Sequence, residues 1–192
     1  MPPIEVHPLQ PFLPPAARVL MLGSFPPPRQ RWSMDFFYPN FANDMWRVMG
    51  QVFFADKDHF VDRAHKTFRL EALRQFLTEK GIALYDTASA VRRTEGSAAD
   101  SNLEIVEPTD IAALLRQLPR CQAIITTGDL ATRLLARSLA LPALPRIGAP
   151  VATSIGGNSI CCHRLPSTSR RLPGPIEQKA AAYAEILKFL NQ

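Results

Sequence analysis

Hydrophobic positions along the chain fall into short, near-continuous runs separated by longer stretches of mixed character. The runs occupy residues 18–22, 82–86, 122–127 and 159–165. Apolar runs of four to seven residues, each flanked by turn residues, are typical of strands in a parallel sheet that is buried on both faces. The sequence therefore predicts four central strands.

The stretches between these runs repeat their apolar residues with helical periodicity. They predict helices at residues 42–53, 67–80, 109–117, 129–140 and 175–190. Thr109 and Asp110 are candidate N-caps for one helix, and Asp129 follows Gly128 at the start of another. Alternating strands and helices predict an α/β fold, a three-layer α/β/α sandwich around a central, mainly parallel four-stranded sheet.

Proline marks the loops between these elements. Most of the 18 prolines gather in four clusters, at residues 2–15, 26–28, 142–150 and 166–175. We expect residues 1–16 to form an extended N-terminal arm. Because no linker or repeat divides the chain, residues 1–192 are expected to form a single domain.

Composition narrows the function classes without choosing among them. Hydrophobic residues make up 46% of the chain and charged residues 20%, as in ordinary globular proteins. No apolar run is long enough to cross a membrane, and the N-terminus lacks the pattern of a signal peptide, so we expect a cytoplasmic protein. The three cysteines lack metal-ligand spacing, so no metal or cofactor is expected. The net charge of +5 is compatible with a polyanionic partner.

Three unusual segments directly follow predicted strands or lie beside them. Gly23-Ser24-Phe25-Pro26 comes after the first strand, where glycine allows close backbone approach and proline fixes the exit of the chain. It matches neither a Walker loop nor a dinucleotide fingerprint. Residues 35–47 (DFFYPNFANDMWR) carry aromatics that could stack on a planar base or form part of the core.

The third segment, residues 165–171 (LPSTSRR), follows the last predicted strand. Its hydroxyls, backbone N–H groups and arginines suit DNA phosphates, although an ordinary Ser/Thr turn would have the same composition. Four basic residues and one acid lie between positions 164 and 179.

In this order, GSFP, the run aromatic–Pro–x–x–x–Asn–x–x–Trp, and LPSTS resemble the motifs of the uracil-DNA glycosylase superfamily. The middle segment is similar to that of the mismatch-specific uracil and deoxyinosine (hypoxanthine) DNA glycosylase branches, and the stretch with GSAAD at 96–100 is similar to the mismatch-specific group. The resemblance spans residues 18–188. It implies a monofunctional DNA glycosylase of base excision repair, which flips uracil or hypoxanthine out of DNA and hydrolyses the N-glycosidic bond. DNA is then the partner, and we expect a monomer.

The resemblance also assigns roles to single residues. Asn43 and Ser24 are the candidate catalytic pair, with Asn43 positioning water, although Asn43 could instead cap a helix. The candidate base-binding residues are Gly23, Phe25, Pro26, Tyr38, which would stack on the base, and Thr127, which would read its edge. The candidate DNA-binding residues are Pro166, Ser167, Thr168, Ser169, Arg170 and Arg171. Arg170, Arg171 or Leu172 would fill the gap left in the duplex.

Two positions depart from the family pattern. Phe25 stands where many relatives carry the Asp or Asn that activates water, and Leu165 replaces a histidine, with His163 two residues earlier. Because Thr127 has no amide to pair with uracil, strict uracil specificity is not expected. Two alternatives stay open: a lesion-binding relative without catalysis, and a small α/β hydrolase using Ser24 with His163 and Asp86.

Overall fold

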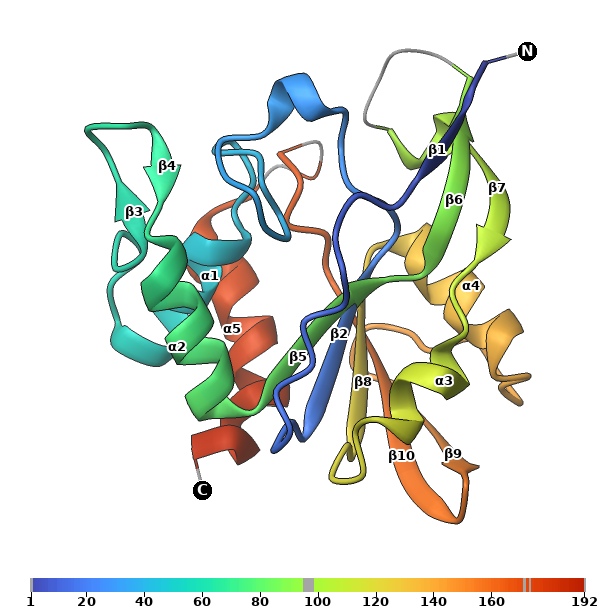
Figure 1. Ribbon diagram of the computed structural model, residues 1–192. Coiled ribbons are helices and arrows are strands. Elements are labelled where there is room, and N and C mark those ends of the chain that lie inside the picture. The colour runs from blue at the N-terminus through green and yellow to red at the C-terminus, as the bar shows by residue number, and fades with distance from the viewer. Residues whose placement is uncertain (1, 95–98, 171, 173, 192) are drawn as a thin grey trace.

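A five-stranded, mostly parallel sheet forms the centre of the protein (Figure 1). The computed structural model describes residues 2–94, 99–170, 172 and 174–191. Within them the strand order is β5–β2–β8–β10–β9. The first four strands are parallel neighbours with the bounds Ile82–Asp86, Val19–Gly23, Ala123–Thr127 and Asn158–Leu165.

The fifth strand corrects the predicted four-stranded sheet. Strand β9 (Val151–Ile155) pairs antiparallel with β10 at the sheet edge. Its residues alternate between half-buried and exposed, so they do not form the apolar run that revealed the other four. An edge strand covered on one side needs no continuous apolar sequence.

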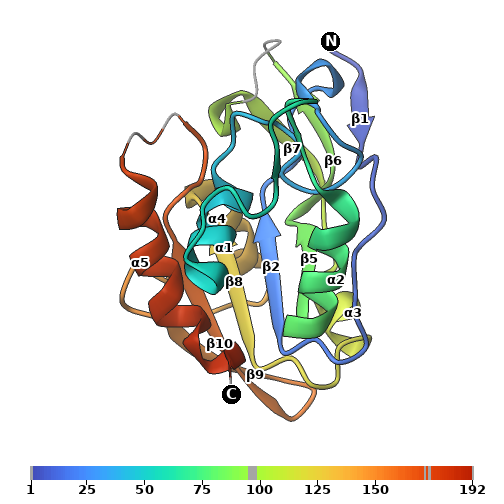
Figure 2. The same cartoon turned by 90° about the vertical axis from the view of Figure 1, so that its left-hand side faces the viewer.

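Helices cover both faces of the sheet, as the three-layer prediction requires (Figures 1 and 2). On one face lie α1 (Met45–Phe54), α2 (Leu70–Lys80) and α5 (Ile176–Leu187), and on the other α3 (Ile111–Arg116) and α4 (Asp129–Ser138). Strand β2 shows why both faces need covering. Its fully buried side chains alternate, Val19 and Met21 entering the core beside α1 and α5, Leu20 and Leu22 the core beside α3.

The helix ends follow local chemistry. Asp110 caps α3 by accepting a hydrogen bond from the Ala113 N–H at 2.9 Å, as predicted. The other candidate cap, Thr109, instead donates to the carbonyl of Asp86 at 2.7 Å. The helix predicted at residues 67–80 begins at Leu70 in the structure, because residues 67 and 68 belong to a strand.

Two small antiparallel sheets were not predicted. One joins β1 (Ile4–Val6), β6 (Ala88–Arg93) and β7 (Leu103–Pro108). The other is a hairpin of β3 (Val61–Asp62) and β4 (Thr67–Phe68). The extended N-terminal segment thus contributes a strand beside β6, and a further bridge joins Phe12 to Leu84 at the edge of the main sheet. Three short 3₁₀ helices, η1 (Arg29–Arg31), η2 (Asp100–Asn102) and η3 (Lys188–Asn191), complete the described elements.

The three cysteine side chains lie within or beside the hydrophobic core. All three cysteines are free, Cys121 and Cys162 are buried, and Cys161 is half-buried. Burial raises the pKa of Cys121 to about 11, which keeps this thiol protonated and unreactive. In the described part of the chain, no helix is long and apolar enough to cross a membrane, and no group of three His, Cys, Asp or Glu residues could hold a metal.

Candidate active site

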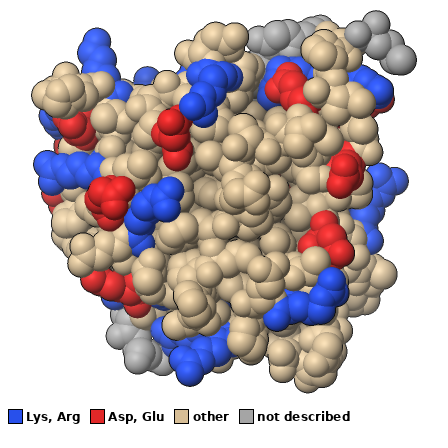
Figure 3. Space-filling model, viewed as in Figure 1, with Lys and Arg blue, Asp and Glu red and all other residues tan. Residues whose placement is uncertain are grey.

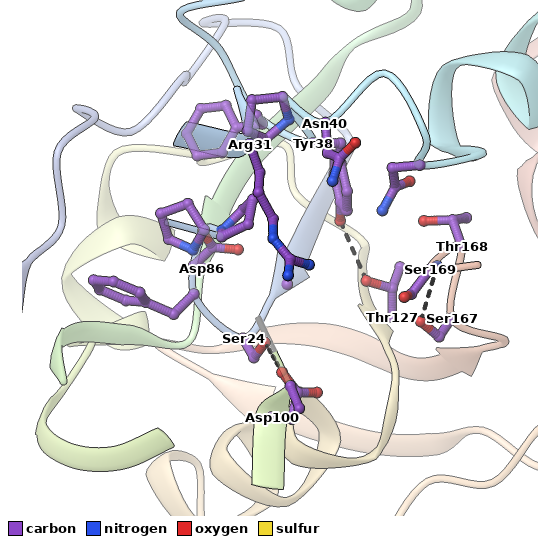
Figure 4. A pocket seen from close by; sticks show the side chains of 18 of the residues that line it. Ser24, Arg31, Tyr38, Asn40, Asp86, Asp100, Thr127, Ser167, Thr168 and Ser169 are labelled. Carbon is purple, nitrogen blue, oxygen red and sulfur yellow. Dashed lines mark hydrogen bonds between the residues drawn. The ribbon is translucent and has the colours of Figure 1, made fainter. Parts of the chain in front are cut away.

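The C-terminal ends of the parallel strands meet around a pocket of about 480 Å³ (Figure 4). Open α/β sheets bind ligands at this end. Eleven of the site residues predicted from sequence line this pocket: Gly23, Ser24, Phe25, Pro26, Tyr38, Asn43, Thr127, Ser167, Thr168, Ser169 and Arg170. Pro166 is not among the lining residues, and Arg171 lies outside the described residues.

The turn after β2 is held rigidly in the pocket wall. The carbonyl of Gly23 accepts hydrogen bonds from the Thr87 N–H at 2.9 Å and the Thr87 hydroxyl at 3.0 Å. The carbonyl of Pro26 accepts one from the buried Arg93 at 3.0 Å. A Cβ at Gly23 would lie 2.4 Å from Oδ1 of Asp86, so a larger residue here would displace the Asp86 carboxylate.

The side chain of Phe25 offers the pocket no polar group, and its ring has a packing role. It meets the ring of His7 edge-on, with 5.4 Å between the ring centroids. The guanidinium of Arg93 lies 5.9 Å from the centre of the Phe25 ring. His7 of the N-terminal segment and Arg93 of β6 therefore hold this turn in place through the Phe25 ring.

The pocket contains two carboxylates that were not predicted as site residues of a glycosylase; the sequence had suggested Asp86 only for the hydrolase alternative. Asp86 ends β5 and is the ladder partner of Gly23, so its side chain lies beside the GSFP turn. The Nε2–H of His7 donates to Asp86 Oδ2 at 2.9 Å, and both residues are buried. The hydroxyl of Ser24 donates to Oδ1 of Asp100 at 2.6 Å.

The two carboxylates have different surroundings. Although Asp100 keeps part of its surface exposed, partial burial raises its pKa, an effect that the hydrogen bond from Ser24 opposes. Asp86 has one oxygen bound by His7 and the other next to Gly23. In sequence, the only signals for these residues were the position of Asp86 at the end of an apolar run and of Asp100 in GSAAD.

Tyr38 adopts a left-handed backbone conformation, with φ of 49°, which residues other than glycine seldom take. This turn directs its hydroxyl to that of Thr127, 3.3 Å away (Figure 4), while its ring meets Trp46 edge-on. Burial and the nearby Asp86 charge raise the pKa of the Tyr38 phenol above its ordinary value, so it stays a neutral hydroxyl.

Asn43 lies at the pocket wall and also supports the start of α1. Its Oδ1 accepts a hydrogen bond from the Met45 N–H at 2.9 Å, which fixes the orientation of the amide. The bond forms a turn that leads into α1, and Asp44 occupies the N-cap position of that helix. The amide nitrogen has no partner among the described residues and remains available as a donor at the pocket.

The loop after β10 is anchored by α5 and by the start of α1. Tyr183 donates its hydroxyl proton to the carbonyl of Pro166 at 2.9 Å, and the Asp44 N–H donates to the carbonyl of Thr168 at 3.0 Å. The Ser167 hydroxyl accepts from the Ser169 N–H at 3.2 Å. These bonds hold the hydroxyl-rich loop at the pocket edge.

Arg31 and Asn40 also line the pocket and were missed from sequence. Arg31 comes from η1, and its guanidinium extends into the pocket (Figure 4). The pairings observed around Ser24 do not match the hydrolase alternative. Ser24 donates to Asp100, and Asp86 is bound by His7 instead of His163.

No protein-family model and no curated protein matches the chain. A solved structure does match, an NMR structure from Methanosarcina acetivorans described as a "putative Uracil DNA glycosylase". The TM-score is 0.63 at 21% sequence identity, and the match covers 95% of this chain and 96% of the other. The two proteins therefore share a fold over almost their whole lengths.

Proposed function

We propose that the protein is a monofunctional DNA glycosylase of base excision repair, a monomer that needs no cofactor. It flips uracil or hypoxanthine into the pocket and hydrolyses the N-glycosidic bond. The observation that carries the proposal is the meeting of the GSFP turn, Tyr38, Asn43 and the loop after β10 around one pocket that also holds two carboxylates. The fold shared with the Methanosarcina acetivorans protein supports it.

N-glycosidic hydrolysis passes through a transition state with oxocarbenium character, like that of other glycosides. A water oxygen bonds to the anomeric carbon, and the bond to the base nitrogen breaks. The base leaves with the bonding electron pair, and the water gives up a proton. The protein must therefore position a water, accept its proton and stabilise the departing base anion.

Asp86 suits the role of proton acceptor that Phe25 cannot fill. Its Oδ2 is bound by His7, which fixes the carboxylate, and its Oδ1 lies beside Gly23 in the pocket wall. Asn43 then holds the water through its amide group. Ser24 supports the site by fixing Asp100 through their hydrogen bond.

The base would be held by the GSFP backbone and by stacking on Tyr38. The Thr127 hydroxyl, already paired with that of Tyr38, offers one polar contact to the base edge. One hydroxyl cannot reproduce the paired donor and acceptor of an amide, so uracil and hypoxanthine can both be accepted. Flipping is least costly at damaged or mismatched pairs, which favours deaminated bases.

The DNA backbone would be held by the loop after β10. Ser167, Ser169 and Arg170 line the pocket edge there, and Arg171 follows in sequence. Hydroxyls, backbone N–H groups and arginines are common phosphate ligands in DNA-binding proteins.

The proposal is tested with duplexes that each carry one uracil, hypoxanthine, xanthine or mismatched thymine, treated with alkali after incubation. We expect strand cleavage at uracil or hypoxanthine after alkali and none before it, because hydrolysis by water leaves an intact abasic site. If lesion duplex is bound but no abasic site forms with any of the four, the non-catalytic alternative replaces the proposal.

A further inference from the structure

A second cavity, of about 410 Å³, adjoins the candidate active site. It lies between α1, the β3–β4 hairpin and the start of α5, and Arg170 lines both cavities. Five basic side chains contribute to its lining, Arg47, Lys57, Arg63, Lys66 and Arg170. We call it the cationic pocket.

The two carboxylates in this lining are already neutralised. Asp44 forms a buried ion pair with Lys179 at 2.9 Å, and Asp58 forms one with Arg63. In the part of the chain that the structure describes, Lys57, Lys66 and Arg170 form no ion pair. The cationic pocket therefore carries a positive charge that its own acids do not cancel.

Arg47 shows that this charge is held in place. Its Nη1 donates to the carbonyls of Phe41 at 2.8 Å and Asn43 at 3.2 Å. Its guanidinium lies 4.7 Å from the centre of the Phe41 ring. A cation fixed in this way loses little conformational freedom when an anion binds.

The electrostatics of Arg47 agree with this view. Burial lowers its pKa, and the charges of Arg170 and Arg63 lower it further, although Asp44 and Asp58 oppose them. An arginine remains charged despite such a shift. An anion in the pocket would relieve the repulsion among these cations.

We propose that the cationic pocket binds backbone phosphates of DNA beside the flipped nucleotide. The proposal rests on DNA being the substrate. Arg170 joins the two cavities, so a strand whose base enters the active site can continue into the cationic pocket. Phosphodiesters repeat along such a strand, so they can neutralise several cations of the pocket where a single small anion cannot.

The test removes two exposed lysines that line the cationic pocket and leaves the residues of the active site unchanged. In the double variant Lys57→Ala/Lys66→Ala, neither replaced residue lines the active site. The matched control Arg120→Ala/Arg137→Ala removes two charges elsewhere, from the turn before β8 and from the last turn of α4. Binding of an undamaged duplex is measured by fluorescence anisotropy over a range of salt concentrations.

The salt dependence of binding counts the phosphates that the protein neutralises. The slope of log Kobs against log salt concentration is negative. We expect its magnitude to decrease by roughly 0.7–0.9 for each phosphate that the lysine variant no longer neutralises. The control should keep the parental slope. Neutral methylphosphonate linkages are then placed one at a time along the lesion strand. At defined positions beside the lesion they should weaken binding by the parent. At the same positions they should not weaken binding by the lysine variant any further.

Equal slopes for the parent and the lysine variant, or an equal decrease in the control, would contradict the proposal that the cationic pocket binds phosphates. Failure of the parent to release any base counts against the glycosylase proposal alone, since the salt slope reports on the pocket independently.

Discussion

At the scale of single residues, the site places its carboxylates on segments other than the GSFP turn. Phe25 packs against His7, and the neighbouring strand supplies Asp86 through the pairing of Gly23 with Asp86. These two partners are far apart in the sequence, so only the sheet brings them together. Sequence reasoning could place Gly23 and Thr127 at strand ends. It could not show which acid faces the GSFP turn.

Asn43 has two roles that substitution can separate. Asn43→Ser keeps a side-chain acceptor for the Met45 N–H, whereas Asn43→Ala removes it. Both lose the amide at the pocket. We expect the alanine variant to lose about 1 kcal/mol of unfolding free energy and the serine variant less, in urea titrations. Both should lose roughly 100-fold in excision rate because the water is misplaced. A serine variant that excises at the parental rate would leave Asn43 with only its structural role at the start of α1.

Asp100 makes stability depend on pH. Its pKa is higher in the folded protein than in the unfolded chain, so ionisation costs folding free energy. The cost is absent below the ordinary pKa of Asp, grows as pH rises, and is complete above the raised pKa. Asn is neutral and its Oδ1 can still accept from Ser24.

Asp100→Asn should therefore unfold at a higher temperature than the parent at neutral pH. The difference should shrink as the pH falls and vanish once Asp100 is protonated in both states. Thermal unfolding followed by circular dichroism across this range measures it. A difference that is constant with pH would show that the charge of Asp100 is not its cause.

At the scale of elements, α1 and α5 position the loop that is proposed to hold DNA. Asp44, which precedes α1, pairs with Lys179 of α5 and donates its N–H to Thr168. Tyr183 of the same helix binds Pro166. The two helices thus fix the PSTS segment of this loop at two points.

Lys179→Met tests this arrangement. The Lys179 side chain is 6% exposed and that of Asp44 is 12% exposed, so the variant leaves a buried charge without its partner. Such a loss costs about 3–5 kcal/mol of unfolding free energy, and we expect a value in this range from urea titration. Adding Asp44→Asn should recover much of it, because no unpaired charge remains. If the double variant is no more stable than Lys179→Met alone, the unpaired charge of Asp44 is not the cause of the lost stability.

At the scale of the whole molecule, the layers could be predicted but the outlying sheets could not. The four buried strands and the helices are evident from local periodicity, as along β2 and α5. Strands β1, β6 and β7 form an antiparallel sheet whose members come from distant parts of the chain. Strands such as β7 and β9 are largely half-buried or exposed, so they lack a continuous apolar run.

The distribution of charge also belongs to this scale. Figure 3 shows acidic and basic side chains interspersed around the rim of one face, with an uncharged area at its centre. The net charge of +5 therefore does not make this face uniformly basic. Under the proposed function, affinity for DNA should come from local groups around the two cavities, such as Arg31, Arg170 and the lysines of the cationic pocket.

The most direct measurement of the central claim is the single-turnover rate of base release from a hypoxanthine or uracil duplex, compared between the parent and Asp86→Asn. The variant keeps the shape of the side chain and an acceptor for His7 but cannot take a proton from water. We predict release by the parent and a rate lower by about 100-fold or more in the variant, with DNA binding unchanged or tighter. Equal rates would contradict the assignment of Asp86, and no release by the parent from either duplex would contradict base excision at this pocket.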